Sequence, residues 1–362
     1  MPGSNPISGP KKALVIRYGA YGDAVVATPV LRLLKEDGYR VTLNCSEYSA
    51  DVYKHNPNVD EFIVHITNSV PNVELDKHWT KLAEGYDKVI NLSESVEKTL
   101  LKMEGHPDFK WSKEERHETC NVNYYDRTLE LAGYAGCEGT LPELFFSREE
   151  EKWASLLRHQ YKNRFLILWS LSGSSFHKVY HRADEVARGF LERHKDAVTF
   201  TVGGDLERLL EWDHPSNRKR CNQWPIRKSL IMTKYADLVV GTETGVLNAS
   251  ACYDTPKIVM LSHSSEENLT KHWKNCTSLY SNAPCYPCHQ LHYTLESCPL
   301  ESISEAPSVG YSSKEIKFRT KEKYPACMAL LNPDKLRNAI EERYQEWRSK
   351  WQPLQPRQLQ LS

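Results

Sequence analysis

The segment ALVIRYGAYGDAVVATPVLRLLKEDG, residues 13–38, decides the predicted fold. It begins with a short apolar run, turns at the glycines of 19–23, and continues with apolar residues at the spacing of an amphipathic helix. Gly38 is placed to end that helix. A strand, a glycine turn and a helix in this order predict the start of a βαβ unit with a parallel sheet.

The same alternation runs on through the first half of the chain and restarts in the second. Further strands are predicted at 39–45, 61–66, 87–93, 236–244 and 255–261, and a strand followed by a turn is predicted at 163–175 and at 197–205. Helices are predicted at 47–55, 74–84, 121–134, 183–195, 205–212, 227–236, 245–253 and 332–350. The polar stretch 94–125 is expected to be a mobile loop over a cleft. The restart predicts two open α/β units rather than one continuous sheet.

The predicted domain organisation follows from this restart. A disordered leader (1–12) precedes an N-terminal Rossmann-like domain (13–150), and a C-terminal Rossmann-like domain (151–331) contains a cysteine-rich loop (276–327). A terminal helix (332–350), capped by Asn332, and a flexible tail (351–362) complete the chain.

Composition narrows the class of protein. Hydrophobic residues make up 40% and charged residues 26%, which is typical of globular domains and argues against wholesale disorder. Lys+Arg and Asp+Glu are both 47, so no net charge draws the chain to nucleic acid or membrane. No apolar run approaches the roughly 18 residues of a spanning helix, and the polar leader does not resemble a signal peptide. We therefore expect a cytoplasmic location.

One basic stretch of the sequence leaves an anionic acceptor possible. Arg218, Lys219, Arg220, Arg227 and Lys228, with Trp212 and Trp224 nearby, could contact a nucleic acid or phosphorylated glycolipid acceptor. A solvated surface loop is the alternative, and we favour it.

Two glycine turns contain the candidate catalytic and ligand-binding residues. Gly19–Asp23 and Gly241–Gly245 each join a predicted strand to a helix, at the sheet edge where open α/β proteins bind ligands. Asp23 could either cap its helix or act in catalysis. Glu243 could accept hydrogen bonds from ribose or sugar hydroxyls, and Thr242 or Thr244 could cap the second helix.

Together these blocks resemble a known family. RYGAYGDAVVATPVLRLLK and ADLVVGTETGVLNASACYDTPKIVML are similar to the Leu-Gly-Asp and Asp-Thr-Gly blocks of glycosyltransferase family 9, the ADP-heptose lipopolysaccharide heptosyltransferases. YDKVINLSES (86–95) and FLILWSLSGSSFHKVY (165–180) also match family blocks in order. The resemblance implies a GT-B fold, with an acceptor domain before a nucleotide-sugar donor domain, and an inverting transfer to a glycan or other hydroxyl.

The resemblance also assigns candidate residues. Asp23 would be the general base, and Lys178 would offset charge on the departing nucleotide. The implied donor-binding residues are Gly22, Ser172, Gly173, Gly203, Gly204, Asp205, Thr242, Glu243, Thr244, Gly245 and Asn248. An ADP- or UDP-sugar is expected as donor substrate, and no catalytic cofactor is required.

Some residues depart from the family pattern. Glu243 replaces the usual Asp, Asn248 replaces a common His, and Ala20-Tyr21 replaces Ser-Leu before the Gly-Asp pair. These departures leave the donor sugar open. A nucleotide-sugar epimerase on the same scaffold and a non-catalytic nucleotide- or partner-binding protein are the alternatives.

Cysteines cluster late in the chain. Cys285 and Cys288 have the C-x₂-C spacing of a zinc knuckle, and Cys298 and Cys327 follow. The four could form a structural zinc site, with His289 and His292 as alternative ligands. Thiols without metal are the other interpretation.

Overall fold

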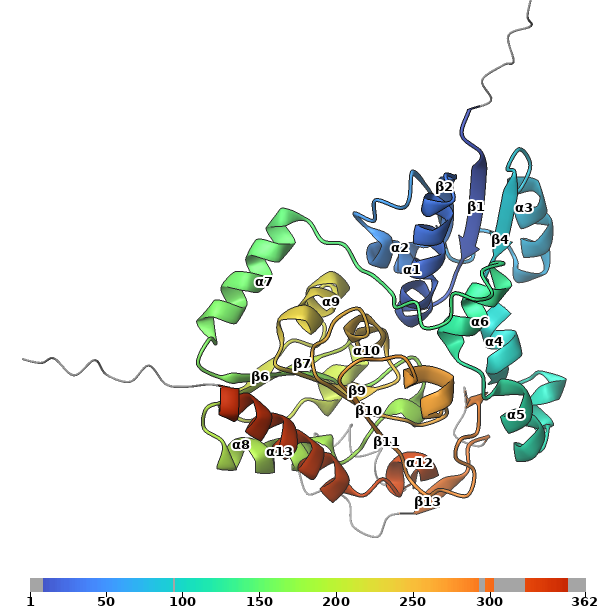
Figure 1. Cartoon of the computed structure of the whole chain (residues 1–362). Helices are drawn as coiled ribbons and strands as arrows, with labels where there is room; N and C mark the ends of the chain where they lie inside the picture. The colour runs from blue at the N-terminus through green and yellow to red at the C-terminus, as the bar shows by residue number, and fades with distance from the viewer. Residues whose placement is uncertain (1–8, 94, 293–296, 303–322, 351–362) are drawn as a thin grey trace, which may run out of the picture.

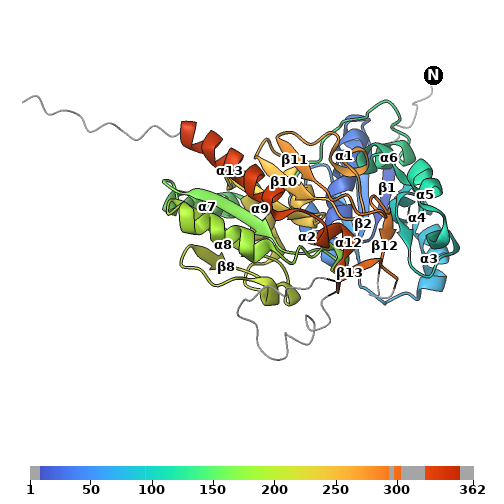
Figure 2. The ribbon, with the colours of Figure 1, turned by 90° about the horizontal axis from the view of Figure 1, so that it is seen from below.

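The computed structural model describes residues 9–93, 95–292, 297–302 and 323–350. Residues 1–8 of the predicted leader, the predicted tail and two parts of the cysteine-rich loop, 293–296 and 303–322, lie outside the described residues. Figures 1 and 2 show the first half of the chain, in blue to cyan, at one end of the molecule and the second half at the other.

Each half contains a parallel sheet. The first has the strand order β3-β2-β1-β4, in which every neighbouring pair is parallel. Its strands are β1 (Lys12–Arg17), β2 (Arg40–Ser46), β3 (Glu61–His65) and β4 (Lys88–Asn91). Parallel order follows from the crossover helices that separate consecutive strands. The helices of this half are α1 (Tyr21–Glu36), α2 (Glu47–Tyr53), α3 (Leu75–Leu82), α4 (Ser95–Leu100), α5 (Lys113–Cys120) and α6 (Tyr124–Leu131).

The second sheet is larger and has the order β11-β10-β9-β6-β7-β8, again parallel throughout. Its strands are β6 (Phe165–Ser170), β7 (Ala197–Val202), β8 (Asn217–Lys219), β9 (Leu238–Thr242), β10 (Lys257–Met260) and β11 (Cys276–Leu279). Its helices are α7 (Arg148–Gln160), α8 (Ala183–Arg193), α9 (Ile226–Tyr235), α10 (Gly245–Ser250), α12 (Ala326–Ala329) and α13 (Pro333–Lys350). Short helical turns are η1 (Asn72–Glu74), η2 (Pro107–Lys110), η3 (Phe176–Lys178), η4 (Leu206–Leu210) and η5 (Glu266–Thr270).

Helices cover both faces of the large sheet, as Figure 1 shows. Alternate residues of β6 enter different core clusters: Phe165 and Ile167 pack with α8 and α13, and Leu166 and Leu168 with α9 and α10. A strand buried on both faces reads as a continuous apolar run, as FLILW does in the sequence. The predicted α/β class with two parallel sheets is therefore confirmed.

The halves are also joined by backbone pairing. β5 (Lys102–Met103) of the first half pairs in parallel with β12 (Gln290–Leu291) of the second. A further short pair, β13 (Leu300–Ser302) with β14 (Lys323–Pro325), is antiparallel.

The loop predicted at 94–125 was wrong, since this stretch contains α4, β5, η2 and α5. Ser112 caps α5 through a capping box with Glu115: the Glu115 N–H donates to Ser112 Oγ at 3.1 Å, and the Ser112 N–H donates to the Glu115 carboxylate at 2.7 Å. The Ser-x-x-Glu spacing of a capping box is present in the sequence at 112–115. The loop was predicted because the stretch around it is highly charged.

Candidate active site

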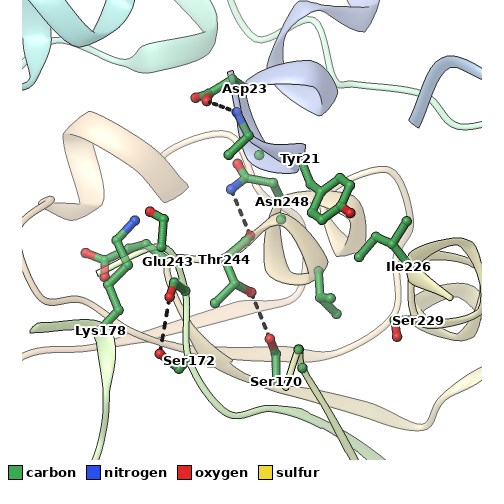
Figure 3. A pocket seen from close by; sticks show the side chains of 18 of the residues that line it. Tyr21, Asp23, Ser170, Ser172, Lys178, Ile226, Ser229, Glu243, Thr244 and Asn248 are labelled. Carbon is green, nitrogen blue, oxygen red and sulfur yellow. Dashed lines mark hydrogen bonds between the residues drawn. The ribbon is translucent and has the colours of Figure 1, made fainter. Parts of the chain in front are cut away.

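A cavity of about 610 Å³ lies between the two halves at the carboxyl ends of the parallel strands (Figure 3). This volume is typical of small-molecule sites, which span ~300–1,000 Å³. The predicted site residues that line it are Gly22, Asp23, Ser172, Gly173, Lys178, Gly203, Gly204, Glu243, Thr244, Gly245 and Asn248. Asp205 and Thr242 are not among its lining residues. Segments far apart in sequence thus form one cavity.

Asp23 lies in the first turn of α1, and its carboxylate contacts Ala20 and Arg17. Oδ2 accepts a hydrogen bond from the Ala20 N–H at 2.8 Å, and Oδ1 pairs with the Arg17 guanidinium at 3.1 Å. The Arg17 side chain is only 3% exposed, whereas that of Asp23 is 32% exposed. The capping contact foreseen for Asp23 is therefore present, and its carboxylate is still accessible from the cavity.

The first turns of α1 and α10 approach each other closely because both carry glycine. A Cβ added to Gly245 would lie 2.6 Å from Tyr21 Cβ and 3.2 Å from Gly22 N. A Cβ on Gly22 would lie 3.2 Å from the Asn248 amide. The two glycine turns quoted from the sequence are thus in contact.

Asn248 links this contact to α6. Tyr125 Oη, from the first half, donates to Asn248 Oδ1 at 2.8 Å, and Asn248 Nδ2 donates to the Thr244 carbonyl at 3.0 Å. The Thr244 hydroxyl accepts from the Leu247 N–H at 3.2 Å and lies 3.0 Å from Ser170 Oγ. Thr244, rather than Thr242, is the cap of α10.

Lys178 lies across Gly173 at the wall of the cavity. A Cβ on Gly173 would come within 2.8 Å of Lys178 Cδ, so the glycine provides the space for the lysine stem. The Thr242 hydroxyl, which does not line the cavity, donates to the Lys178 carbonyl at 2.7 Å. Burial lowers the pKa of Lys178, and the carboxylates of Glu243 and Asp23 oppose that shift. Among the described residues, the Lys178 ammonium makes no hydrogen bond or close ion pair.

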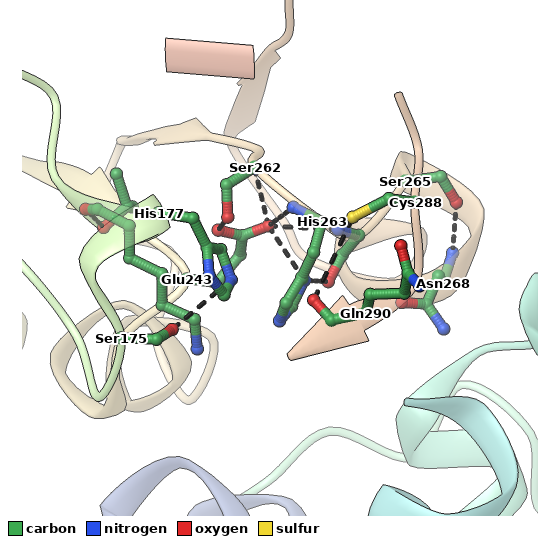
Figure 4. Close-up of polar contacts among 12 residues, drawn as sticks. Ser175, His177, Glu243, Ser262, His263, Ser265, Asn268, Cys288 and Gln290 are labelled. Carbon is green, nitrogen blue, oxygen red and sulfur yellow. Dashed lines mark hydrogen bonds and ion pairs between the residues drawn. The ribbon is translucent and has the colours of Figure 1, made fainter. Parts of the chain in front are cut away.

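Glu243 is oriented toward the loop after β10 (Figure 4). Its Oε1 accepts from the backbone N–H groups of residues 262, 263 and 264 at 2.7, 3.1 and 3.2 Å, and its Oε2 accepts from the Ser262 hydroxyl at 2.5 Å. Burial would raise the pKa of Glu243, but His263, Lys178 and Ser262 outweigh it and hold that pKa below its usual value. The carboxylate is charged and has several donors within the protein, which the predicted contact with donor hydroxyls did not anticipate.

A third turn, the one after β7 at residues 203–205, also contributes to the cavity. Glu207 of η4 accepts from the Gly204 N–H at 2.7 Å and lines the cavity. Asp205 instead pairs with Arg208 at 2.9 Å and accepts from Asn222 at 3.0 Å, with its side chain 65% exposed. The helix predicted at 205–212 is only this short turn, which explains why Glu207 and not Asp205 reaches the cavity.

The predicted basic patch is largely occupied by contacts inside the protein. Arg227 is 7% exposed and binds Glu150 and the carbonyls of Asp51 and Phe145. Lys228 lies over the ring of Trp153. These contacts do not support the nucleic-acid contact that the basic run left open.

The predicted zinc site is not supported. The described residues, which include all four cysteines and both histidines, contain no group of three or more His, Cys, Asp or Glu side chains that could hold a metal ion. Burial raises the pKa of Cys288 and of Cys298 to about 12. Burial and then the nearby cysteines raise the pKa of Cys327, so the four lie in one region.

Sequence reasoning missed several lining residues. Tyr21, Ser170, Glu207, Ser229 and His263 all line the cavity. Ser170 and His263 follow or end predicted strands, so position alone could have marked them. Tyr21 lies within the first glycine turn, whereas Glu207 and Ser229 could be placed only once the positions of η4 and α9 were known.

The fold defined by these two sheets and the cavity between them is GT-B, as comparison with solved structures shows. A family 9 glycosyltransferase from Veillonella parvula is 15% identical with a TM-score of 0.61, covering 93% of this chain and 98% of its own. The ADP-heptose lipopolysaccharide heptosyltransferase II of E. coli is 14% identical with a TM-score of 0.61, covering 93% and 99%. The E. coli heptosyltransferase WaaC with ADP is 13% identical with a TM-score of 0.53, covering 92% and 99%.

These likenesses confirm the predicted resemblance at the level of the fold. No family model and no curated protein matches the sequence. In the described part of the chain, no helix has the length and apolar character needed to span a membrane.

Proposed function

We propose that this protein is an inverting glycosyltransferase that transfers a sugar from a nucleotide donor to an acceptor hydroxyl. The observation that carries the proposal is the joint cavity, which is lined by Asp23 of the first half and by Lys178 and the glycine turns of the second. The structures with the same fold are glycosyltransferases, and one of them was solved with ADP.

In the proposed reaction, the acceptor oxygen attacks the anomeric carbon while Asp23 takes the hydroxyl proton. The bond between that carbon and the donor phosphate breaks, and its electron pair goes to the phosphate oxygen. Arg17 and the Ala20 N–H hold the Asp23 carboxylate in place. Lys178, whose ammonium makes no hydrogen bond with the described residues, offsets the charge that develops on the departing nucleotide.

The donor is proposed to lie along the second half. Gly203, Gly204 and Glu207 line the end of the cavity that we assign to the nucleoside, together with Trp224 and Ser229. Thr244 and Gly245 also line the cavity, and we assign the diphosphate to them. An ADP- or UDP-sugar fits this assignment, and a glycan hydroxyl would approach from the side of Asp23.

Thermal shift against a panel of ADP- and UDP-sugars tests the donor site. We expect at least one to raise the midpoint of unfolding, because a ligand that binds only the folded state stabilises it. A panel without effect at millimolar concentration would overturn the proposal. An epimerase would convert the nucleotide sugar with no acceptor present, so product analysis without acceptor excludes that reaction.

The Asp23→Asn variant tests the general base. Asn keeps an oxygen that can accept from the Ala20 N–H but cannot take the acceptor proton. We expect donor binding within a few-fold of wild type and a transfer rate ~100- to 10,000-fold lower, measured as nucleotide release with a panel of glycan acceptors. Unchanged transfer by the variant would remove Asp23 from the mechanism.

A further inference from the structure

His263 lies in the cavity wall beside Lys178 and was not anticipated from the sequence. It lies in the loop after β10, it is 4% exposed, and it lines the cavity. The carboxylate that holds its loop is Glu243, through three backbone N–H groups. The position of His263 is therefore fixed by the backbone and not only by its own side chain.

The imidazole is also fixed in orientation. Its Nδ1 lies 2.6 Å from Ser264 Oγ and 3.3 Å from Glu243 Oε1 (Figure 4). The ring of His177 packs against it with centroids 5.3 Å apart. Both polar contacts of the ring with described residues use Nδ1, so Nε2 is the nitrogen available to a ligand.

Glu243 and Ser264 determine where the ring carries its protons. The Glu243 carboxylate can only accept, so its oxygen at 3.3 Å favours a proton on Nδ1, and Ser264 Oγ can accept from the same N–H. An anionic oxygen at Nε2 favours a second proton there. The ring is then an imidazolium that donates from Nδ1 inside the protein and from Nε2 to the ligand.

The cavity has hydrogen-bond donors for an anion at this point. Three carboxylates line it, but each already accepts hydrogen bonds: Asp23 from Ala20, Glu207 from Gly204, and Glu243 from the 262–264 loop. Lys178 has a donor group without a hydrogen-bonded partner among the described residues. Lys178 and the Nε2 edge of His263 are thus two donors in one wall, which matches the needs of a phosphate oxygen.

We propose that His263 is a catalytic residue whose Nε2–H donates a hydrogen bond to the diphosphate of the donor, and that Glu243 is the positioning residue that holds it there. This inference rests on the proposed function. As the bond from the anomeric carbon to the phosphate oxygen breaks, the electron pair stays on that oxygen and the proton of the acceptor goes to Asp23. The His263 hydrogen bond strengthens as the oxygen gains charge.

The test is titration calorimetry of the full chain with ADP and UDP, followed by comparison of the tighter nucleotide with its monophosphate. In His263→Asn the amide can keep the contacts made by Nδ1 but cannot reach the place of Nε2, whereas in His263→Gln it can. We expect His263→Asn to weaken diphosphate binding about 10- to 100-fold and His263→Gln to restore part of it. His159→Asn, at an exposed position in α7, is the matched control.

The outcomes separate this inference from the function beneath it. A loss confined to the diphosphate, with monophosphate binding nearly unchanged, supports the role of His263. Wild-type-like diphosphate binding by His263→Asn, or an equal loss for both nucleotides, overturns that role and leaves the transferase proposal intact. If the wild-type chain binds no nucleotide, both proposals fail. Glu243→Gln should reproduce the diphosphate-specific loss in weaker form, and a normal Kd would remove its positioning role.

Discussion

At the scale of single residues, the cavity contains a buried charged group, Lys178, that lowers the free energy of unfolding. In the part of the chain that the structure describes, no carboxylate forms an ion pair with Lys178 in the cavity wall, and burial lowers the pKa of this lysine. An uncompensated polar group of this kind costs stability, and such costs are common where a protein binds a ligand. The cost makes sense if an anion completes the site.

This argument predicts opposite effects of Lys178→Met on stability and on binding. Met keeps the apolar stem over Gly173 and removes the unpaired charge, so we expect the free energy of unfolding without ligand to stay equal or rise. Loss of the charged donor should weaken ADP binding about 10-fold or more. Denaturant unfolding and calorimetry measure the two effects. Lys162→Met, at an exposed position, should change neither, and a Lys178→Met variant that binds ADP normally would contradict the assignment.

Some of these residues could be predicted from the sequence and others could not. Asp23 and Gly245 lie in strand–turn–helix segments, whose geometry places the turn at the sheet edge, and Asn248 was singled out through the family resemblance. The partner of Asp23, Arg17, was not singled out, because nothing local indicates that a strand-end arginine turns back to its own helix. The orientation of Glu243 was also missed, since it depends on where the loop after β10 runs.

At the scale of elements, the contact between α1 and α10 decides the shape of the cavity. Both helices begin at glycine turns, and the absence of side chains there lets the two backbones meet. The helices themselves were predictable from apolar spacing and from Gly38. Their contact was not, because it joins residues more than 200 positions apart and the sequence carries no direct signal of that pairing.

Gly245→Ala tests this contact. The new Cβ would lie 2.6 Å from Tyr21 Cβ, so α10 or the turn before α1 must shift. Overpacking of this kind costs about 1–3 kcal/mol, and we expect unfolding free energy to fall by that amount together with nucleotide affinity. Gly189→Ala, inside α8, is the control: its nearest neighbour would be the end of Arg193 at 3.8 Å, so it should gain about 0.5–1 kcal/mol. Equal stability changes for the two variants would refute the close-approach argument.

At the scale of the whole molecule, the two halves are joined by more than the linker. β5 pairs with β12, with backbone hydrogen bonds from Lys102 N to His289 O at 2.8 Å and from Glu104 N to Leu291 O at 3.3 Å. Tyr125 and Asn248 add a buried hydrogen bond across the same seam. The sequence predicted two units from its restarting alternation, but not this seam, because β5 and β12 are too short to be recognised as strands by pattern.

Arg227 makes further contacts between the two halves, away from β5 and β12. Removing this side chain is the strongest test of how the halves depend on each other. Its guanidinium donates to the Asp51 carbonyl of the first half at 2.6 Å, to the Phe145 carbonyl at 2.8 Å and to Glu150 at 2.8 Å. Arg227→Ala would leave the Glu150 carboxylate without this partner, and we expect a loss of about 3–5 kcal/mol. Because the contact joins the halves, scanning calorimetry should show one unfolding transition in the wild type and a broadened or divided one in the variant. A variant that unfolds in one transition at the wild-type temperature would mean that the other contacts between the halves, among them β5 with β12, α1 with α10 and Tyr125 with Asn248, hold them together without Arg227.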